Sequence, residues 1–232
     1  MIRVTDLAYV RFRAPDLDRM EAFLTDFGMV RSARTDTALY MRGTDALHHL
    51  HVTELGDPAF VGVGMQAASA ADLGVLARAT GSAVEDVAEP GGGRRVRLVD
   101  PNGIAIEVVH GMAAVAPLPV PSRQVNVGSD RRRRGEPQRV ERGPAHVKRL
   151  GHFVLLVNDF RETERFYHSH FGLVNSDEIY LGDRTAGAGG VHALLRIAAP
   201  STSTTTPFSP SAPAWSSSIT TSPSSCTIST TS

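Results

Sequence analysis

Short apolar runs alternate with amphipathic stretches along the first 112 residues of the chain. Runs rich in β-branched and aromatic residues predict strands at 7–13, 38–41, 48–52, 60–66, 94–98 and 104–109. Apolar positions at helical spacing predict helices over 16–27 and 71–79, the first capped by Asp16 and ended at Gly28. The turn DPNG at 100–103 favours a hairpin between the last two strands. This order predicts an α+β fold, in which two βαβββ halves lie side by side and curl into an open, cup-shaped barrel.

The start of this pattern recurs later in the chain. LAYVRFRAPDLDRMEAFLTDFGMV, from Leu7, matches LGHFVLLVNDFRETERFYHSHFGLV, from Leu150, with one inserted residue before the second Phe-Gly. The second copy predicts a strand at 153–157 and a helix that is capped by Asp159 and ended at Gly172. A recurring unit of this kind indicates a second domain built on the same plan.

The repeat and the changes in composition divide the chain into four regions. Residues 1–112 form an N-terminal domain, 113–147 a Pro/Arg/Gly-rich connector, 148–197 the first half of a second domain, and 198–232 a Ser/Thr/Pro-rich tail. No Lys, Arg, Asp, Glu or His follows Arg196. We expect the N-terminal domain to fold alone. We expect the incomplete second domain to expose an apolar face that its missing half would cover.

Composition excludes several classes of partner. The formal net charge is +0, so no polyanionic partner such as nucleic acid is implied, and the run Arg131–Arg134 is interpreted as a solvated connector because Glu136 and Glu141 follow it. A single cysteine, Cys226, excludes an internal disulfide framework and fits the reducing cytoplasm. The charged N-terminus is no signal peptide, and no apolar run is long enough to span a membrane.

Three stretches together carry a resemblance to a known family. They are LVDPNGIAIEVV at 98–109, the connector sequence RRGEPQRVERGPAHVKRLGH, and LGHFVLLV in the second copy. With the βαβββ repeat, the chain resembles a type one extradiol ring-cleavage dioxygenase of the catechol 2,3-dioxygenase-like kind, in the vicinal oxygen chelate superfamily. The resemblance covers about residues 5–198.

This resemblance implies a metal centre in the second domain. Members of the family hold Fe(II), or in some cases Mn(II), on two His and one Glu, which leaves adjacent positions for an aromatic diol and O₂. His152 stands where the family places its first histidine. In the N-terminal domain Tyr9 takes that place, FVGVGMQ has no histidine, and Glu107 matches the position of the carboxylate ligand. The N-terminal domain is therefore expected to be a structural copy without a metal.

A second cluster resembles a metal site by composition alone. His48, His49 and His51 lie in the sequence HHLH, and strand alternation would place His49 and His51 on one face. The cluster aligns with the end of a half-domain rather than with the ligand strands. We therefore interpret these residues as solvated or core-edge histidines.

The remaining ligands expected from the resemblance are missing. They should follow Arg196, but the last histidine is His192 and the last glutamate is Glu178. Back-translation of the tail from Ile219 with GC-rich codons, shifted by two bases, gives the string HHLAFELHD, which has the form the family uses around its second histidine. We interpret the tail as an out-of-frame translation of the last quarter of a dioxygenase, with a natural disordered tail as the alternative.

Two classes of function follow from these observations. The first is an extradiol dioxygenase by descent, which is inactive in the chain as given because ligands are missing. The second is a non-catalytic small-molecule-binding protein that uses the N-terminal cup. A glyoxalase-like isomerase would require a metal ligand at Tyr9. The sequence leaves the choice of diol and the formation of a homo-oligomer open.

Overall fold

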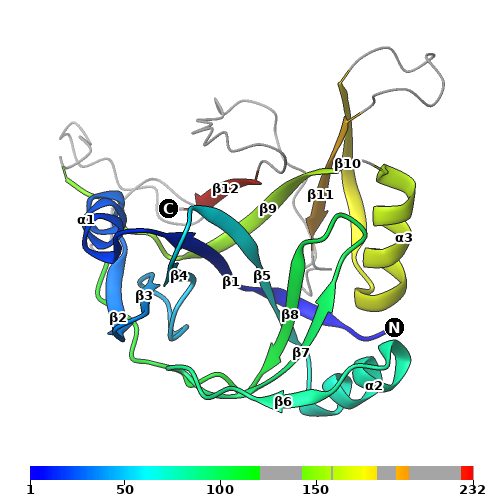
Figure 1. Cartoon of the computed structure of the whole chain (residues 1–232), viewed down its shortest axis with the longest axis horizontal. Helices are drawn as coiled ribbons and strands as arrows, with labels where there is room; N and C mark the ends of the chain where they lie inside the picture. Colours follow the sequence, from blue (N-terminus) through cyan, green and yellow to red (C-terminus); the bar gives the residue numbers. More distant parts are fainter. Residues whose placement is uncertain (121–142, 158, 182–191, 199–225, 232) are drawn as a thin grey trace, which may run out of the picture.

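The two halves of the N-terminal domain join in one curled, eight-stranded sheet, with the helices α1 and α2 on its outer side (Figure 1). The structure is a computed structural model that describes residues 1–120, 143–157, 159–181, 192–198 and 226–231. The first half consists of β1 (Val4–Ala14), α1 (Leu17–Phe27), β2 (Val30–Arg34), β3 (Ala38–Arg42) and β4 (His51–Leu55). The second half consists of β5 (Ala59–Ala67), α2 (Ala70–Thr80), β6 (Val84–Asp86), β7 (Arg94–Val99) and β8 (Ala105–His110).

The strand order, β2-β3-β4-β1-β5-β8-β7-β6, repeats one pattern in both halves. In the first half β1 pairs in parallel with β4, and in the second half β5 pairs in parallel with β8. The halves meet where β1 and β5 pair antiparallel, with Val10 opposite Val63. The predicted α+β fold of paired βαβββ modules is therefore confirmed.

The helix ends follow the predicted capping residues. The Asp16 side chain accepts a hydrogen bond from the backbone N–H of Arg19, and Gly28 adopts a left-handed conformation with φ 108°. Gly28 has a second reason to lack a side chain, because a Cβ there would lie 1.8 Å from the carbonyl oxygen of Ala145. The connector therefore passes directly over the end of α1.

Two strands of the N-terminal domain were not predicted, and one starts later than expected. The strands β2 and β6 lie at the two edges of the sheet, and neither carries an alternating apolar pattern. The strand predicted at 48–52 begins only at His51, so that His48 and His49 lie in the loop before it. Edge strands bury little apolar surface, which explains why the pattern does not reveal them.

The second domain consists of one half-module and one strand from the tail. Its elements are β9 (Arg149–Val157), α3 (Phe160–Phe171), β10 (Val174–Leu181), β11 (His192–Ala198) and β12 (Cys226–Thr231). They form a four-stranded sheet in the order β10-β11-β9-β12. As predicted, α3 is capped by Asp159 and ends at Gly172 with φ 61°.

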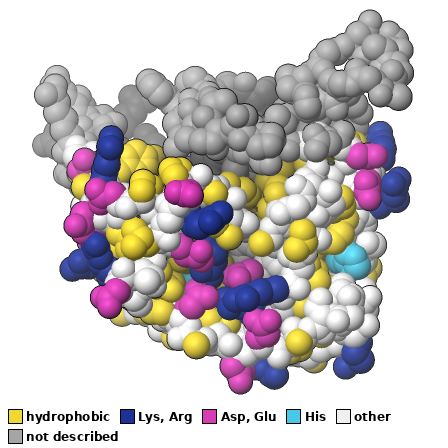
Figure 2. All heavy atoms as spheres, viewed as in Figure 1, with side chains coloured by type: hydrophobic (Ala, Val, Ile, Leu, Met, Phe, Trp, Pro, Cys, Tyr) yellow, Lys and Arg dark blue, Asp and Glu magenta, His cyan; other side chains and the backbone are white. Residues whose placement is uncertain are grey.

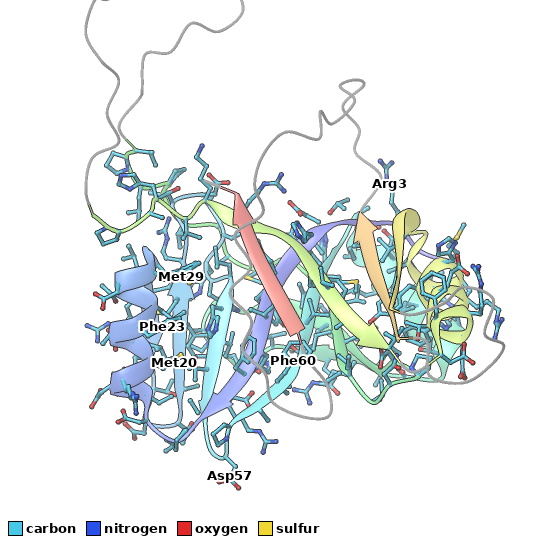
Figure 3. All side chains as sticks on the ribbon, turned by 90° about the horizontal axis from the view of Figure 1, so that it is seen from above. Arg3, Met20, Phe23, Met29, Asp57 and Phe60 are labelled. Atoms are coloured by element: carbon cyan, nitrogen blue, oxygen red, sulfur yellow. The ribbon has the colours of Figure 1, made fainter. Side chains whose placement is uncertain are left out.

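The strand order of the second domain differs from that of the first at one position. The strand β11 pairs directly with β9, with Leu195 opposite Leu155, whereas β4 separates the corresponding strands β3 and β1. On the other side of β9, β12 pairs antiparallel, as β5 does with β1 (Figure 3). We expected the tail to have no role in the sheet, but six of its residues form the strand β12. Residues 199–225 and 232 of the tail lie outside the described residues. The run Arg131–Arg134 of the connector also lies outside them.

The apolar face of the second domain is covered by the N-terminal domain. Phe153 on β9 and Tyr167 and Phe171 on α3 are fully buried, in the same core cluster as side chains of α2 and β5–β8 such as Leu76 and Met65. We expected this face to stay exposed, but the second half of the N-terminal domain packs against it. The two regions therefore share one core.

Polar contacts reinforce this interface at the DPNG turn. The Tyr167 hydroxyl donates to Asp100 Oδ2 at 3.2 Å, and Asn102 Nδ2 donates to Thr163 Oγ1 at 3.0 Å. The backbone N–H of Ile2 also donates to the carbonyl oxygen of His170 at 2.9 Å. Two residues of the predicted hairpin turn thus hold α3 against the N-terminal domain.

Both described ends of the connector lie on the loop between β3 and β4. Thr44 donates its N–H to the carbonyl oxygen of Val147, and its own carbonyl oxygen accepts from Leu118, both at 2.8 Å.

Within the described part of the chain, each helix is too short or too polar to cross a membrane.

Candidate functional site

Three residues from neighbouring strands meet on the inner side of the N-terminal cup. Tyr9 on β1 pairs with Gly64 on β5, which pairs in turn with Glu107 on β8. The Tyr9 hydroxyl donates to Glu107 Oε2 at 2.5 Å. The tyrosine ring lies across the glycine, because a Cβ at Gly64 would be 2.7 Å from Tyr9 Cζ. Burial and the Glu107 carboxylate raise the pKa of Tyr9 far above its usual value, so the phenol keeps its proton.

Glu107 also belongs to a closed ring of two guanidinium groups and two carboxylates. Arg11 Nη2 lies 3.1 Å from Glu107 Oε2 and 2.8 Å from Glu89 Oε2. Arg95 Nη1 lies 2.8 Å from Glu89 Oε1 and 3.4 Å from Glu107 Oε1. Each carboxylate therefore contacts both arginines, one through each oxygen. Glu54 adds a further carboxylate oxygen 2.7 Å from Arg11 Nη1.

The ring is largely buried, which fixes its charges. The side chains of Arg11, Arg95 and Glu107 are 9%, 7% and 10% exposed. Burial opposes the charge on Arg11, but the Glu107 carboxylate beside it raises the pKa of Arg11 above its usual value. Burial alone would raise the pKa of Glu89, yet hydrogen bonds from the two arginines hold it below its usual range. Figure 2 shows charged side chains gathered in the middle of this face of the molecule.

Two of the three clustered histidines are buried, and one of them, His49, lies beside this ring. His49 packs between the rings of Tyr9 and Tyr40, at centroid distances of 5.0 and 5.2 Å, whereas His51 stacks on Phe12 at 5.3 Å. Burial lowers the pKa of His49 to about 3 and that of His51 to about 4. Both are therefore core-edge rather than solvated histidines, and they have different neighbours.

His152 lies at the position on β9 that Tyr9 has on β1. The matching helix caps show this correspondence, because Asp159 follows His152 by the same spacing as Asp16 follows Tyr9. His152 is half-buried and lies opposite Ser229 on β12, as Tyr9 lies opposite Gly64. Among the residues that the structure describes, no three His, Cys, Asp or Glu side chains come together as a metal site. The described surroundings of His152 thus do not fit a centre with two His and one Glu.

Comparison with known proteins gives matches only at the level of structure. No family model and no curated protein matches the sequence. The Mn(II)-bound glyoxalase from Novosphingobium aromaticivorans superposes with a TM-score of 0.60 at 24% identity, over 79% of this chain and 57% of that one. Homoprotocatechuate 2,3-dioxygenase from Brevibacterium fuscum, in complex with 3,4-dihydroxyphenylacetate, superposes with a TM-score of 0.58 at 19% identity, over 76% of this chain and 53% of that one. A catechol 2,3-dioxygenase superposes with a TM-score of 0.60 at 22% identity, over 84% of this chain and 63% of that one.

The chain has the vicinal oxygen chelate fold. It spans between 53% and 63% of the length of these three proteins. Because the neighbours include both ring-cleaving dioxygenases and a glyoxalase, the vicinal oxygen chelate fold alone does not decide the reaction. The choice rests on the residues at the site.

Sequence reasoning did not find the ring of arginines and glutamates. A signal exists at Arg11, which lies between the apolar residues Val10 and Phe12 in β1, whereas Arg95 follows another arginine in β7 and gives no such signal. Charged residues at inward-facing strand positions need partners of opposite charge when they are buried. The partner Glu89 comes from the loop before β7, and no strand pattern places it there.

Proposed function

We propose that the chain descends from an extradiol dioxygenase, which cleaves a catechol-like diol with O₂ at a non-haem Fe(II) centre in the cytoplasm, and that His152 corresponds to its first ligand. The observation that supports this proposal is the geometry of the equivalent position in the N-terminal domain. There, Tyr9 and Glu107 come from strands on either side of Gly64, and their side-chain oxygens are 2.5 Å apart. Residues at this register therefore converge closely enough to share one metal ion.

The chain as given should lack ring-cleavage activity. One imidazole cannot hold Fe(II) in a defined geometry, and β12 places Ser229 opposite His152, where the resemblance would require a second histidine. The test is anaerobic loading with Fe(II), or with Mn(II), followed by addition of catechol and O₂. We expect no yellow ring-fission product above the blank, for the chain and for His152→Ala alike. Turnover that His152→Ala abolishes would contradict the predicted inactivity and the frameshift interpretation together.

The coding DNA around the Arg196 codon provides a separate test of descent. An intact downstream frame that encodes His-His-x-Ala-Phe and a later Glu would support the frameshift. The protein expressed from the restored frame should then form the yellow product, and His152→Ala in that protein should abolish it. A restored protein whose activity does not depend on His152 would refute the ligand assignment.

The alternative function, binding of a small molecule in the N-terminal cup, has less support. The carboxylates and guanidinium groups on the inner side of the cup are paired with one another rather than presented to a ligand. The Tyr9–Glu107 hydrogen bond likewise occupies the position where a glyoxalase-like site would need a metal ligand. The paired charges favour a structural role for the N-terminal copy.

A further inference from the structure

The imidazoles of His48 and His49 approach each other through the same kind of nitrogen. Their Nδ1 atoms are 3.0 Å apart, and the two rings are nearly perpendicular, at 87°. This distance suits a hydrogen bond in which one Nδ1–H donates to the other Nδ1, and Ser32 Oγ lies 3.4 Å from His48 Nδ1. The pair lies in the loop before β4, whereas His152 lies on β9.

We propose that His48 and His49 form a binding site for a divalent transition-metal ion, preferentially Cu(II), which takes the place of the shared proton between the two Nδ1 atoms. Imidazole nitrogens are strong ligands for Cu(II), Ni(II) and Zn(II). No third His, Cys, Asp or Glu joins the pair within the described residues, so water fills the remaining coordination positions. The site is independent of the proposed dioxygenase centre.

The separation of the two nitrogens selects the ion. With metal–nitrogen bonds of about 2.0–2.1 Å, nitrogens 3.0 Å apart subtend an angle of about 94° at the metal. This angle suits neighbouring positions of a tetragonal Cu(II) or Ni(II) ion, whereas a tetrahedral Zn(II) ion would need the nitrogens about 3.3 Å apart. Cu(II) also binds nitrogen ligands more strongly than Ni(II) or Zn(II).

The surroundings hold both rings in this arrangement. His49 is 4% exposed and packs between the rings of Tyr9 and Tyr40. His48 is half-buried and contacts the glycine-rich loop before β7, where a Cβ at Gly91 would lie 3.1 Å from its Cγ. Gly91 has φ 97°, a conformation that favours glycine, and so leaves room for the His48 ring. Ligands fixed in advance by their neighbours lose little freedom when a metal binds.

The test is a titration of the full chain with Cu(II), Ni(II) and Zn(II) salts, followed by calorimetry and, for Cu(II), by electron paramagnetic resonance. We expect one equivalent of Cu(II) to bind most tightly, with an axial spectrum that shows coupling to imidazole nitrogen. His48→Ala and His48→Gln should each weaken this binding at least about tenfold. His48→Gln keeps a polar side chain beside His49 and so guards against loss of the fold, which circular dichroism checks.

One histidine variant serves as the matched control. His146→Ala removes an exposed histidine of the connector and should leave Cu(II) binding unchanged. Unchanged Cu(II) affinity in folded His48→Gln would overturn the proposal, and so would the absence of Cu(II) binding by the full chain. Tighter binding of Zn(II) than of Cu(II) would refute the selection by geometry.

Discussion

Phe27 and Phe171 occupy the same position of the repeat and differ in burial. Each is the last residue of its helix and precedes the glycine that ends it. Phe171 is 0% exposed in the core shared by the two domains, whereas Phe27 is 41% exposed and stacks on Phe23 at the surface of α1. In Figure 3 Phe23 lies on α1, while Met20 and Met29 belong to the cluster between that helix and the sheet. The substitutions Phe171→Ala and Phe27→Ala therefore remove the same atoms from two environments.

The expected losses of stability differ several-fold. Removal of a fully buried phenylalanine side chain costs about 3–5 kcal/mol, through lost transfer energy and the cavity that remains. Phe27→Ala should cost about 1 kcal/mol or less, because much of its ring is already in water. Since a domain of this size is stable by only about 5–15 kcal/mol, Phe171→Ala should remove a large part of the total.

Urea unfolding followed by far-ultraviolet circular dichroism measures both losses. Because the core extends from α2 across β5–β8 to β9 and α3, we expect one cooperative transition that includes both domains. Limited proteolysis with mass spectrometry should show that peptides from 148–181 are cleaved faster in Phe171→Ala than in Phe27→Ala. Equal losses of stability in the two variants would refute the shared core. If residues 1–112 resist proteolysis equally in the unsubstituted chain and in Phe171→Ala, the N-terminal domain folds alone.

Two further predictions concern single positions of the cup and α2. Gly64→Ala should lower the free energy of unfolding by about 1–3 kcal/mol, because its Cβ would lie 2.7 Å from Tyr9 Cζ. Gly74→Ala inside α2 should raise the free energy of unfolding by up to about 1 kcal/mol, because the atom nearest to the added Cβ is 3.5 Å away. Urea unfolding measures both variants, and a change of the same sign in Gly64→Ala and Gly74→Ala would contradict the packing argument. Burial lowers the pKa of His51 to about 4, so the unfolded chain binds more protons between that pH and about 6.5. In metal-free buffer, the contribution of His51 to stability should be complete above about pH 6.5 and fall by about 3 kcal/mol towards pH 4. His51→Gln should therefore make the total loss of stability over this range smaller; an unchanged loss would assign it to other groups.

The sequence predicts local structure well where the determining residues are neighbours. The cap of α1 by Asp16 and its end at Gly28 depend on contacts within a few residues, and the structure has both. The hairpin chemistry of DPNG is of the same kind, and Gly103 adopts the positive φ of 82° that such a turn requires. The second role of this turn could not be predicted, because Asp100 and Asn102 bind α3 through residues 67 and 61 positions later in the chain.

The candidate site shows the same division between local pattern and distant contact. The position of His152 follows from a repeat that is visible in the sequence, and the fold places it at the predicted strand position. The repeat does not predict which side chains meet on the inner side of the cup. The loop residue Glu89 pairs there with Arg11 from the first half and with Arg95 from the second half. No pattern within one strand indicates which loop crosses the cup.

The contacts of Glu107 show how the N-terminal domain can bury a carboxylate inside its sheet. A buried carboxylate at Glu107 would be strongly unfavourable without compensation, because burial removes its hydration. Tyr9 supplies a proton donor to one carboxylate oxygen, and Arg11 and Arg95 supply positive charge to both. The protein itself thus provides the charge that a metal ion would otherwise provide.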